Sequence, residues 1–320
     1  MLMVLGLVEY WLALVGWTVW RLTRPMRRTA GVAISQGRAA DPSRMSPARR
    51  FSSWTFKHRG VELPVWDIEG DDPQGPVIIF THGWGDSRIG ALSRVGALAP
   101  LASRCIAWDM PGHGDAGGTC TLGIREPESL AALIEQAVGR GEDPHGTLTG
   151  VILYGWSMGA GISIACAARE QRGVGVIGVI AEAVSRDGLT PARAVLAQQG
   201  LPHRFTLGAA LACIGVDAGG MASGLVLARE RDGRFDRLVL AEEVAKRGVP
   251  ILLLHGDADG VCPIDDARAI EMAGVARLQT MHGAGHFGIW TDPTFATKAG
   301  EACRAWIGSL AALPERQQVK

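Results

Sequence analysis

Residues 149–161 read TGVILYGWSMGAG, an apolar run that ends in the pattern Gly-x-Ser-x-Gly. The run before the pattern is typical of a buried parallel strand, and small and apolar residues at helical spacing follow it. A serine presented from a sharp strand-to-helix turn leaves no room for Cβ atoms two positions to either side. Gly155 and Gly159 supply that room, so the stretch predicts Ser157 as a nucleophile.

Two later segments carry the residue types that would complete a serine hydrolase. The segment VPILLLHGDADGVCP at 249–263 is a buried-strand pattern that leads into a loop with Asp257 and Asp259. The segment MHGAGHFG follows with His282 and His286. A carboxylate in such a loop orients an imidazole, and the imidazole takes the serine proton. The residues alone leave both members of each pair open, because a shift of two positions along a loop exchanges them.

With nucleophile, acid and histidine in this order, the chain resembles the α/β-hydrolase superfamily. Members often carry H-G-x-x-D-x-x-V-P at the acid loop and G-A-G-H at the histidine, and here Cys262 stands at the Val position. The resemblance implies Asp259 as the acid and His286 as the base, with Asp257 and His282 as the alternatives. It also implies an α/β-hydrolase fold, in which helices flank a mostly parallel central sheet.

Acyl transfer needs two backbone N–H groups for the oxyanion. The residue after the nucleophile, Met158, is expected to supply one. By resemblance, Trp84 in the segment VIIFTHGWGDS supplies the other. His82 is a candidate second base, but the resemblance implies a structural role. In RCIAWDMPGHGDAGG, the run from Asp109 to Gly114 matches a turn of the superfamily and is interpreted as architecture.

The chain divides into a hydrolase core of residues 51–184 and 249–312, a helical cap at 185–248 and a tail at 313–320. The cap is expected because two strand patterns flank an interval far longer than an ordinary connection. A hairpin is expected around Arg59 and Gly60. Helices are expected at 126–140, 158–172, 264–273 and 292–311, and further strands near 77–82, 104–109, 151–154, 176–184 and 249–255.

Inside the cap interval, residues 207–228 are long and apolar enough to suggest a membrane span. A single crossing there would leave two neighbouring strands of one sheet on opposite sides of the bilayer. A hydrophobic lid over the acyl pocket is therefore expected, with a buried helical hairpin as the alternative.

The N-terminus, MLMVLGLVEYWLALVGWTVW, contains one charged side chain, Glu9, in residues 1–20. A helix of this length, at about 1.5 Å per residue, spans a hydrocarbon core of roughly 30 Å. Four arginines follow it: Arg21, Arg24, Arg27 and Arg28. Positive charge on this side argues against a cleaved signal peptide and predicts a single-pass anchor with the catalytic domain in the cytoplasm. An interfacial or protein-buried helix is the alternative, and residues 21–50 form a basic linker.

The composition of the chain argues against several classes of binding partner and cofactor. The formal net charge is zero, so no overall attraction to nucleic acid is expected. Nothing in the sequence implies a cofactor or metal site, and six scattered cysteines without CxxC spacing indicate buried thiols rather than disulfides.

These observations predict a membrane-associated serine hydrolase that cleaves a carboxylic ester through an acyl-enzyme. The apolar N-terminus and cap favour a lipid-like substrate such as a lysophospholipid or monoacylglycerol. A serine aminopeptidase-like peptidase and an acyltransferase are the enzymatic alternatives. A non-catalytic binding protein on the hydrolase fold is the alternative from another class.

Overall fold

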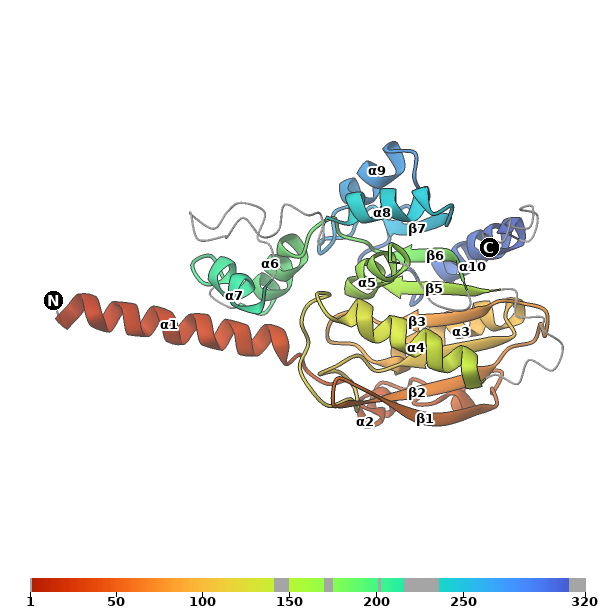
Figure 1. Cartoon of the computed structure of the whole chain (residues 1–320), viewed down its shortest axis with the longest axis horizontal. Helices are drawn as coiled ribbons and strands as arrows, with labels where there is room; N and C mark the ends of the chain where they lie inside the picture. The colour runs from red at the N-terminus through yellow and green to blue at the C-terminus, as the bar shows by residue number, and fades with distance from the viewer. Residues whose placement is uncertain (1, 141–149, 170–174, 201–202, 216–235, 311–320) are drawn as a thin grey trace.

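A computed structural model of the chain describes residues 2–140, 150–169, 175–200, 203–215 and 236–310 (Figure 1). The strands are β1 (Phe51–His58), β2 (Val61–Glu69), β3 (Val77–Thr81), β4 (Arg104–Trp108), β5 (Val151–Trp156), β6 (Val176–Glu182), β7 (Ile251–Gly256) and β8 (Arg277–Met281). The helices are α1 (Leu2–Thr23), α2 (Ala30–Ser35), α3 (Leu92–Leu98), α4 (Glu126–Arg140), α5 (Met158–Ala167), α6 (Leu189–Gln198), α7 (Leu207–Ile214), α8 (Arg237–Lys246), α9 (Ile264–Met272) and α10 (Pro293–Leu310).

All of these strands join one sheet in the order β1-β2-β4-β3-β5-β6-β7-β8. The β1–β2 and β2–β4 pairs are antiparallel, and the pairs from β4 to β8 are parallel. Every residue of β3, β5 and β7 is buried, as expected for strands covered on both faces. The predicted hairpin turns at Arg59 and Gly60, which both adopt positive φ angles.

Helices cover both faces of the sheet (Figure 1). Buried side chains of α4, α5, α8 and α9 pack against one face, and those of α3 and α10 pack against the other. The predicted α/β-hydrolase architecture is therefore confirmed. Strand β3 lies between β4 and β5, so the connections from β3 to β4 and from β4 to β5 run toward opposite edges of the sheet. At such a reversal of strand order a crevice forms beyond the carboxyl ends of the strands, here β3 and β5.

The interval between β6 and β7, predicted as a cap, contains two differently placed parts. Helix α8 packs against α5 and α9 and contributes Ala241 and Val244 to the core, so this part covers the sheet. Helices α6 and α7 lie away from the sheet and beside α1 (Figure 1). Helix α7 is the described part of the apolar run 207–228, whose remainder lies outside the described residues, as does the predicted tail at 313–320.

Helix α1 continues three residues past the predicted end at position 20. Within the described residues, Met3–Thr23 is the one helix long and apolar enough to cross a membrane, a test that a signal sequence also passes. Residues 3–13 are exposed, whereas Val15 and Leu22 are buried in a cluster with residues of α6 and α7. The predicted linker at 21–50 contains α2 and several buried residues, and part of it packs onto the protein.

Candidate active site

Ser157 occupies a strained turn between β5 and α5. Its φ angle is 55°, a left-handed conformation that is rare for a residue with a side chain. A Cβ atom on Gly155 would lie 2.1 Å from the carbonyl oxygen of Gly159, and one on Gly159 would lie 2.0 Å from that of Thr81. The Ser157 N–H donates to the carbonyl of Glu182 on β6 at 2.8 Å. Both glycines are therefore required by the close approach of the backbone around the serine.

The structure brings Ser157, Asp259 and His286 into one hydrogen-bonded chain. His286 Nδ1 lies 2.7 Å from Asp259 Oδ2, and His286 Nε2 lies 3.0 Å from Ser157 Oγ. The Asp259 carboxylate accepts from Nδ1–H, which leaves Nε2 as the acceptor for the serine hydroxyl. The side chains of Asp259 and His286 are 1% and 7% exposed, so the hydrogen bond between them is shielded from solvent.

The loop after β7 fixes the Asp259 carboxylate. Its Oδ1 accepts from the N–H groups of Val261 and Cys262, both at 2.8 Å. Burial opposes ionisation, but the hydrogen bond from His286 and the backbone donors prevail and hold the pKa of Asp259 below its usual range. Asp259 is therefore a carboxylate at neutral pH, aimed at Nδ1 of His286.

The alternatives Asp257 and His282 form a separate pair at the surface. His282 Nδ1 lies 2.9 Å from Asp257 Oδ2, and the Gly283 N–H donates to Asp257 Oδ1 at 2.7 Å. The His282 side chain is 85% exposed. The structure therefore separates this pair from Ser157.

The two expected oxyanion donors flank the serine. Met158 begins α5, where the first N–H groups of a helix have no partner within the helix. Trp84 follows Gly83, and a Cβ atom on Gly83 would lie 3.1 Å from the Cβ of Ser157. His82 is buried, with Nδ1 2.8 Å from the Gly83 carbonyl and Nε2 accepting from the Met110 N–H at 3.0 Å. His82 thus holds the loop rather than facing the serine.

Asp109 has an architectural position, as expected. Its buried carboxylate accepts from the backbone N–H groups of Arg88, at 2.7 Å, and Asp115, at 2.9 Å, and pairs with the Arg88 guanidinium. It therefore joins the loops that follow β3 and β4.

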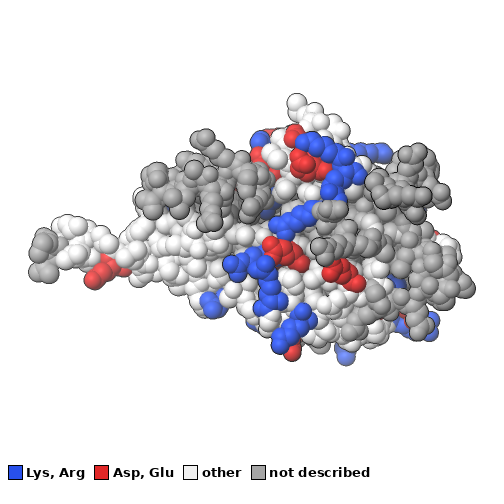
Figure 2. Space-filling view, in the orientation of Figure 1, with Lys and Arg blue, Asp and Glu red and all other residues white. Residues whose placement is uncertain are grey.

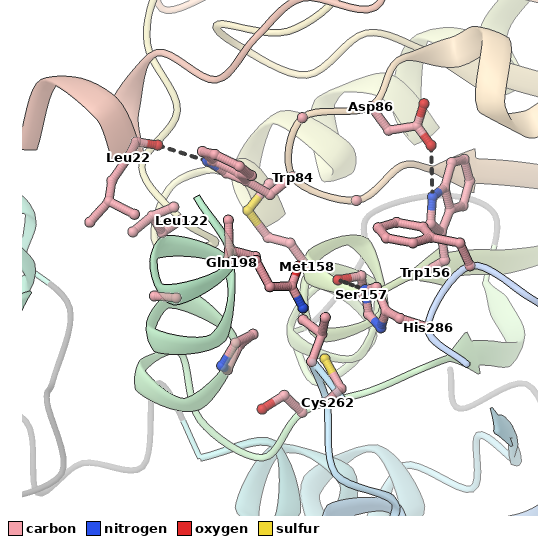
Figure 3. Close-up of a pocket in the computed structure, with 18 of the residues that line it drawn as sticks. Leu22, Trp84, Asp86, Leu122, Trp156, Ser157, Met158, Gln198, Cys262 and His286 are labelled. Carbon is pink, nitrogen blue, oxygen red and sulfur yellow. Dashed lines mark hydrogen bonds between the residues drawn. The ribbon is translucent and has the colours of Figure 1, made fainter. Parts of the chain in front are cut away.

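A cavity of about 430 Å³ opens above Ser157, within the range typical of small-molecule sites. Its walls come from the end of α1, the loop after β3, α6 and the loop after β7, as Figure 3 shows for Leu22, Trp84, Gln198 and Cys262. The Trp84 indole N–H donates to the Leu22 carbonyl at 2.8 Å. Leu22 was not predicted from the sequence to line this cavity, because an apolar helix end carries no sign of what covers it.

A buried polar network behind the turn was not predicted from the sequence either. Arg94 donates to both carboxylate oxygens of Glu182, at 2.8 and 2.6 Å. Tyr154 donates to the same carboxylate at 2.6 Å, and Trp290 donates to it at 2.9 Å. The Arg94 guanidinium also lies 4.0 Å from the ring centroid of Trp156, next to the serine. The sequence does carry one sign of this network. Glu182 interrupts the apolar run VIGVIAEAV, and a glutamate in a buried strand needs a partner.

Asp259, Cys262 and His286 each offer one ligand atom, all within 4.8 Å of one another. Both ring nitrogens of His286 already lie within hydrogen-bond distance of Asp259 and Ser157. The arrangement is therefore that of a proton-relay chain. Burial raises the pKa of the Cys262 thiol, which keeps its sulfur protonated at neutral pH.

The fold and the arrangement around Ser157 are those of the α/β-hydrolase class. The model of the alpha/beta hydrolase family matches residues 78–297. The chain is 25% identical over 227 residues to a monoacylglycerol lipase from Mycolicibacterium smegmatis, covering 66% of this chain and 79% of the relative.

Solved structures share the fold at low identity. A Pyrococcus furiosus esterase superposes with a TM-score of 0.63 at 17% identity, covering 90% of this chain and 99% of the other. Est1E from Butyrivibrio proteoclasticus superposes with a TM-score of 0.59 at 15% identity, covering 82% and 99%. With more than half of its length matched by the family model, the chain belongs to the α/β hydrolase family.

Proposed function

We propose that the protein is a serine esterase that hydrolyses carboxylic esters with lipid-like acyl groups. The observation that carries this proposal is the chain from Asp259 through His286 to Ser157, with distances of 2.7 and 3.0 Å at a turn of positive φ. A nucleophile, a base and an orienting carboxylate in hydrogen-bond contact are the arrangement that activates a serine hydroxyl.

In the proposed reaction, His286 Nε2 accepts the Ser157 proton while Oγ attacks the ester carbonyl carbon. The N–H groups of Trp84 and Met158 stabilise the oxyanion of the tetrahedral intermediate. Its collapse breaks the bond to the alcohol oxygen, which takes the proton from His286 and leaves. Water then attacks the acyl-enzyme with the same histidine as base, and this releases the carboxylic acid and restores the Ser157 hydroxyl. Asp259 stays ionised throughout and stabilises the imidazolium.

An ester with a long acyl group is favoured by the lining of the cavity. Apolar side chains from several elements face it, including Leu22, Leu122, Met158 and Val195. Similarity to a monoacylglycerol lipase and to esterase structures points in the same direction and supports an ester rather than a peptide as substrate. The β6–β7 interval would then act as a cap through α6 and α7, which lie on the cavity side of the molecule.

A fluorophosphonate probe tests the nucleophile directly. We expect the native protein to be labelled stoichiometrically and the Ser157→Ala variant to remain unlabelled, because the phosphonate forms a bond only with an activated serine. The matched control is Ser163→Ala, which removes a buried hydroxyl from α5, the helix that follows Ser157. A native protein that folds but takes no label would favour a non-catalytic binding protein on the hydrolase fold.

A series of p-nitrophenyl esters from acetate to laurate tests the acyl preference. We expect kcat/KM to rise with chain length, since each buried methylene adds about 0.8 kcal/mol of transfer free energy. A preference for short, soluble esters would contradict the lipid-like substrate. Faster turnover of an aminoacyl anilide would indicate a peptidase, and product partition toward an added alcohol would indicate an acyltransferase.

The membrane would be contacted through α1. Residues 3–13 are exposed and uncharged apart from Glu9, and the arginines that follow the helix favour a hydrolase domain on the cytoplasmic side. Full-length protein should sediment with membranes, resist extraction by high salt and retain its first residues by mass spectrometry. Loss of these residues in the mature protein would instead identify α1 as a signal sequence.

A further inference from the structure

Helix α1 has a dual environment that an anchor alone does not require. From residue 3 to residue 13 its side chains are exposed, and large apolar ones such as Met3 and Leu7 are 77% and 62% exposed. From Val15 onward one side of the helix is covered by protein, and Leu22 is only 2% exposed. The same helix therefore has a free half and a half that is packed against the hydrolase domain.

The packed half of α1 is joined to the chain around α7 by specific contacts. The hydroxyl oxygens of Thr18 and Thr206 lie 3.0 Å apart in a buried hydrogen bond. One further contact begins at the end of the exposed half, where the Trp11 indole N–H donates to the carbonyl of Phe205 at 2.9 Å. Val15 and Leu22 share one buried apolar cluster with side chains of α6 and α7, including Leu211. These contacts make α1, α6 and α7 one packed unit.

The exposed half of α1 is too short to cross a bilayer by itself. Eleven residues at about 1.5 Å each extend roughly 16 Å, whereas the hydrocarbon core is about 30 Å thick. If α1 enters the bilayer to the depth that its apolar length allows, α7 enters with it. Helix α7 suits that position, since its sequence LGAALACI carries no charge and Phe205, just before it, is 82% exposed.

The charged residues around α1 and α7 also fit a position at a membrane surface. Figure 2 shows the protruding end of α1 as an uncharged surface interrupted by a small acidic spot, and Glu9 is the one charged residue in positions 1–20. Exposed cations lie past the end of the helix and next to Phe205: Arg24, Arg27, Arg28 and Arg204. An apolar surface bordered by arginines is complementary to a bilayer with anionic headgroups.

The packed end of α1 also lies at the cavity that contains Ser157. Leu22 lines the cavity above Ser157, and its carbonyl accepts the hydrogen bond from the indole of Trp84. Figure 3 shows Leu22 and Trp84 on one side of the cavity and Ser157 and His286 on another. Helix α1 thus runs from its exposed apolar half to a wall of the cavity, where it holds the loop of the proposed oxyanion donor.

We propose that α1, α6 and α7 form one membrane-embedded unit, and that a lipid ester passes from the bilayer into the cavity along the wall made by Leu22. This inference rests on the proposed esterase function and adds the route of the substrate. The acyl chain would remain in an apolar environment from the bilayer to Ser157, so little of it would be transferred through water.

Cys213 on α7 provides a test of the embedded unit in the full-length chain. It is the exposed cysteine, and the other five are buried. We expect a bimane fluorophore on Cys213 to shift to shorter wavelength when the protein binds phosphatidylglycerol-containing vesicles, and doxyl-labelled lipids to quench it at least about twofold. The control carries Cys213→Ser and Met272→Cys, which moves the label to an 87% exposed site on α9. Equal quenching at both sites, or none at Cys213, would overturn the embedded unit.

Leu22 tests the route of the acyl chain. We expect Leu22→Ala to lower the ratio of kcat/KM for laurate over acetate esters by about tenfold, because the long chain loses an apolar wall that the acetyl group does not reach. The control is Val15→Ala, a buried residue of the same helix and cluster outside the cavity lining, which should leave the ratio within about twofold. Equal changes in both variants would show a merely structural role for α1. If the fluorophosphonate labels the protein normally but neither the quenching at Cys213 nor the altered ratio in Leu22→Ala is seen, this inference is rejected and the proposed esterase function stands.

Discussion

Two aspartate–histidine pairs lie next to each other in the chain and differ little in local geometry. Asp257 and His282 meet at 2.9 Å, and Asp259 and His286 meet at 2.7 Å. The difference is in exposure, because the side chain of His282 is 85% exposed and that of His286 is 7% exposed. The remaining ring nitrogen of His286 contacts Ser157, whereas His282 stands at the surface.

This comparison shows that a carboxylate–imidazole contact does not define a catalytic pair. In water such a contact contributes little, because solvent screens the charges and competes for the hydrogen bonds. In the buried pair the same contact sets the tautomer of His286, and the two backbone N–H groups on Asp259 fix the direction of the carboxylate. Burial and a third partner convert an ordinary pair into a proton relay.

The largest effect is expected from removing the two imidazoles in turn. His286→Ala should lower kcat for a p-nitrophenyl ester by about 10⁶-fold, the scale seen when a base that acts as a unit with its serine is removed. His282→Ala should leave kcat within about twofold, since its ring is remote from Ser157. Steady-state kinetics on both purified variants measures the contrast, and similar losses in the two variants would abolish the distinction between the pairs.

Replacing each of the two carboxylates by an amide is expected to give a smaller contrast in the same direction. Asp259→Asn should lower kcat by about 10⁴-fold, because an amide at this position favours the wrong tautomer of His286. Asp257→Asn should leave kcat within about twofold. The folded state of each variant is checked by circular dichroism, so that lost activity is not confused with unfolding. A severe loss in Asp257→Asn alone would reverse the assignment of the acid.

Sequence alone could predict the sheet and most of the flanking helices, because their signals are local. The expected helices at 126–140 and 264–273 agree with α4 and α9 to within one residue. The nucleophile turn was equally readable, since the two glycines are a direct steric consequence of the backbone around Ser157. Choosing between Asp257 and Asp259 was a different problem. Both stand beside small residues in one loop, and only the resemblance to a known motif separated them.

The surroundings of α1 and α8 could not be predicted for a related reason. Apolar periodicity shows that a helix face avoids water but not whether lipid or protein covers it. Leu22 and the apolar residues near the start of α1 look alike in sequence, yet Leu22 lines the cavity and Met3 is 77% exposed. In the same way, α8 falls inside the interval predicted as a cap, while its buried residues pack against the core.

The smallest effect concerns stability and extends the comparison to a histidine that stays neutral. Burial, with a smaller contribution from neighbouring His82, lowers the pKa of His113 from 6.5 to about 3. Between these two values the unfolded chain binds a proton that the native state does not, so stability is fully present above pH 6.5 and is lost as the pH falls toward 3. From pH 7 to pH 5 this histidine should remove about 2 kcal/mol from the free energy of unfolding.

His113→Asn tests this contribution, because the Asn side-chain amide keeps a donor near the Pro111 carbonyl that now lies 3.0 Å from Nδ1. Urea unfolding at pH 7 and pH 5 should show a loss of stability about 2 kcal/mol smaller in this variant than in the native protein. The matched control is the same substitution at His282, a surface histidine whose side chain is 85% exposed. If His282→Asn flattened the profile and His113→Asn did not, burial would no longer explain how the histidines of this chain differ.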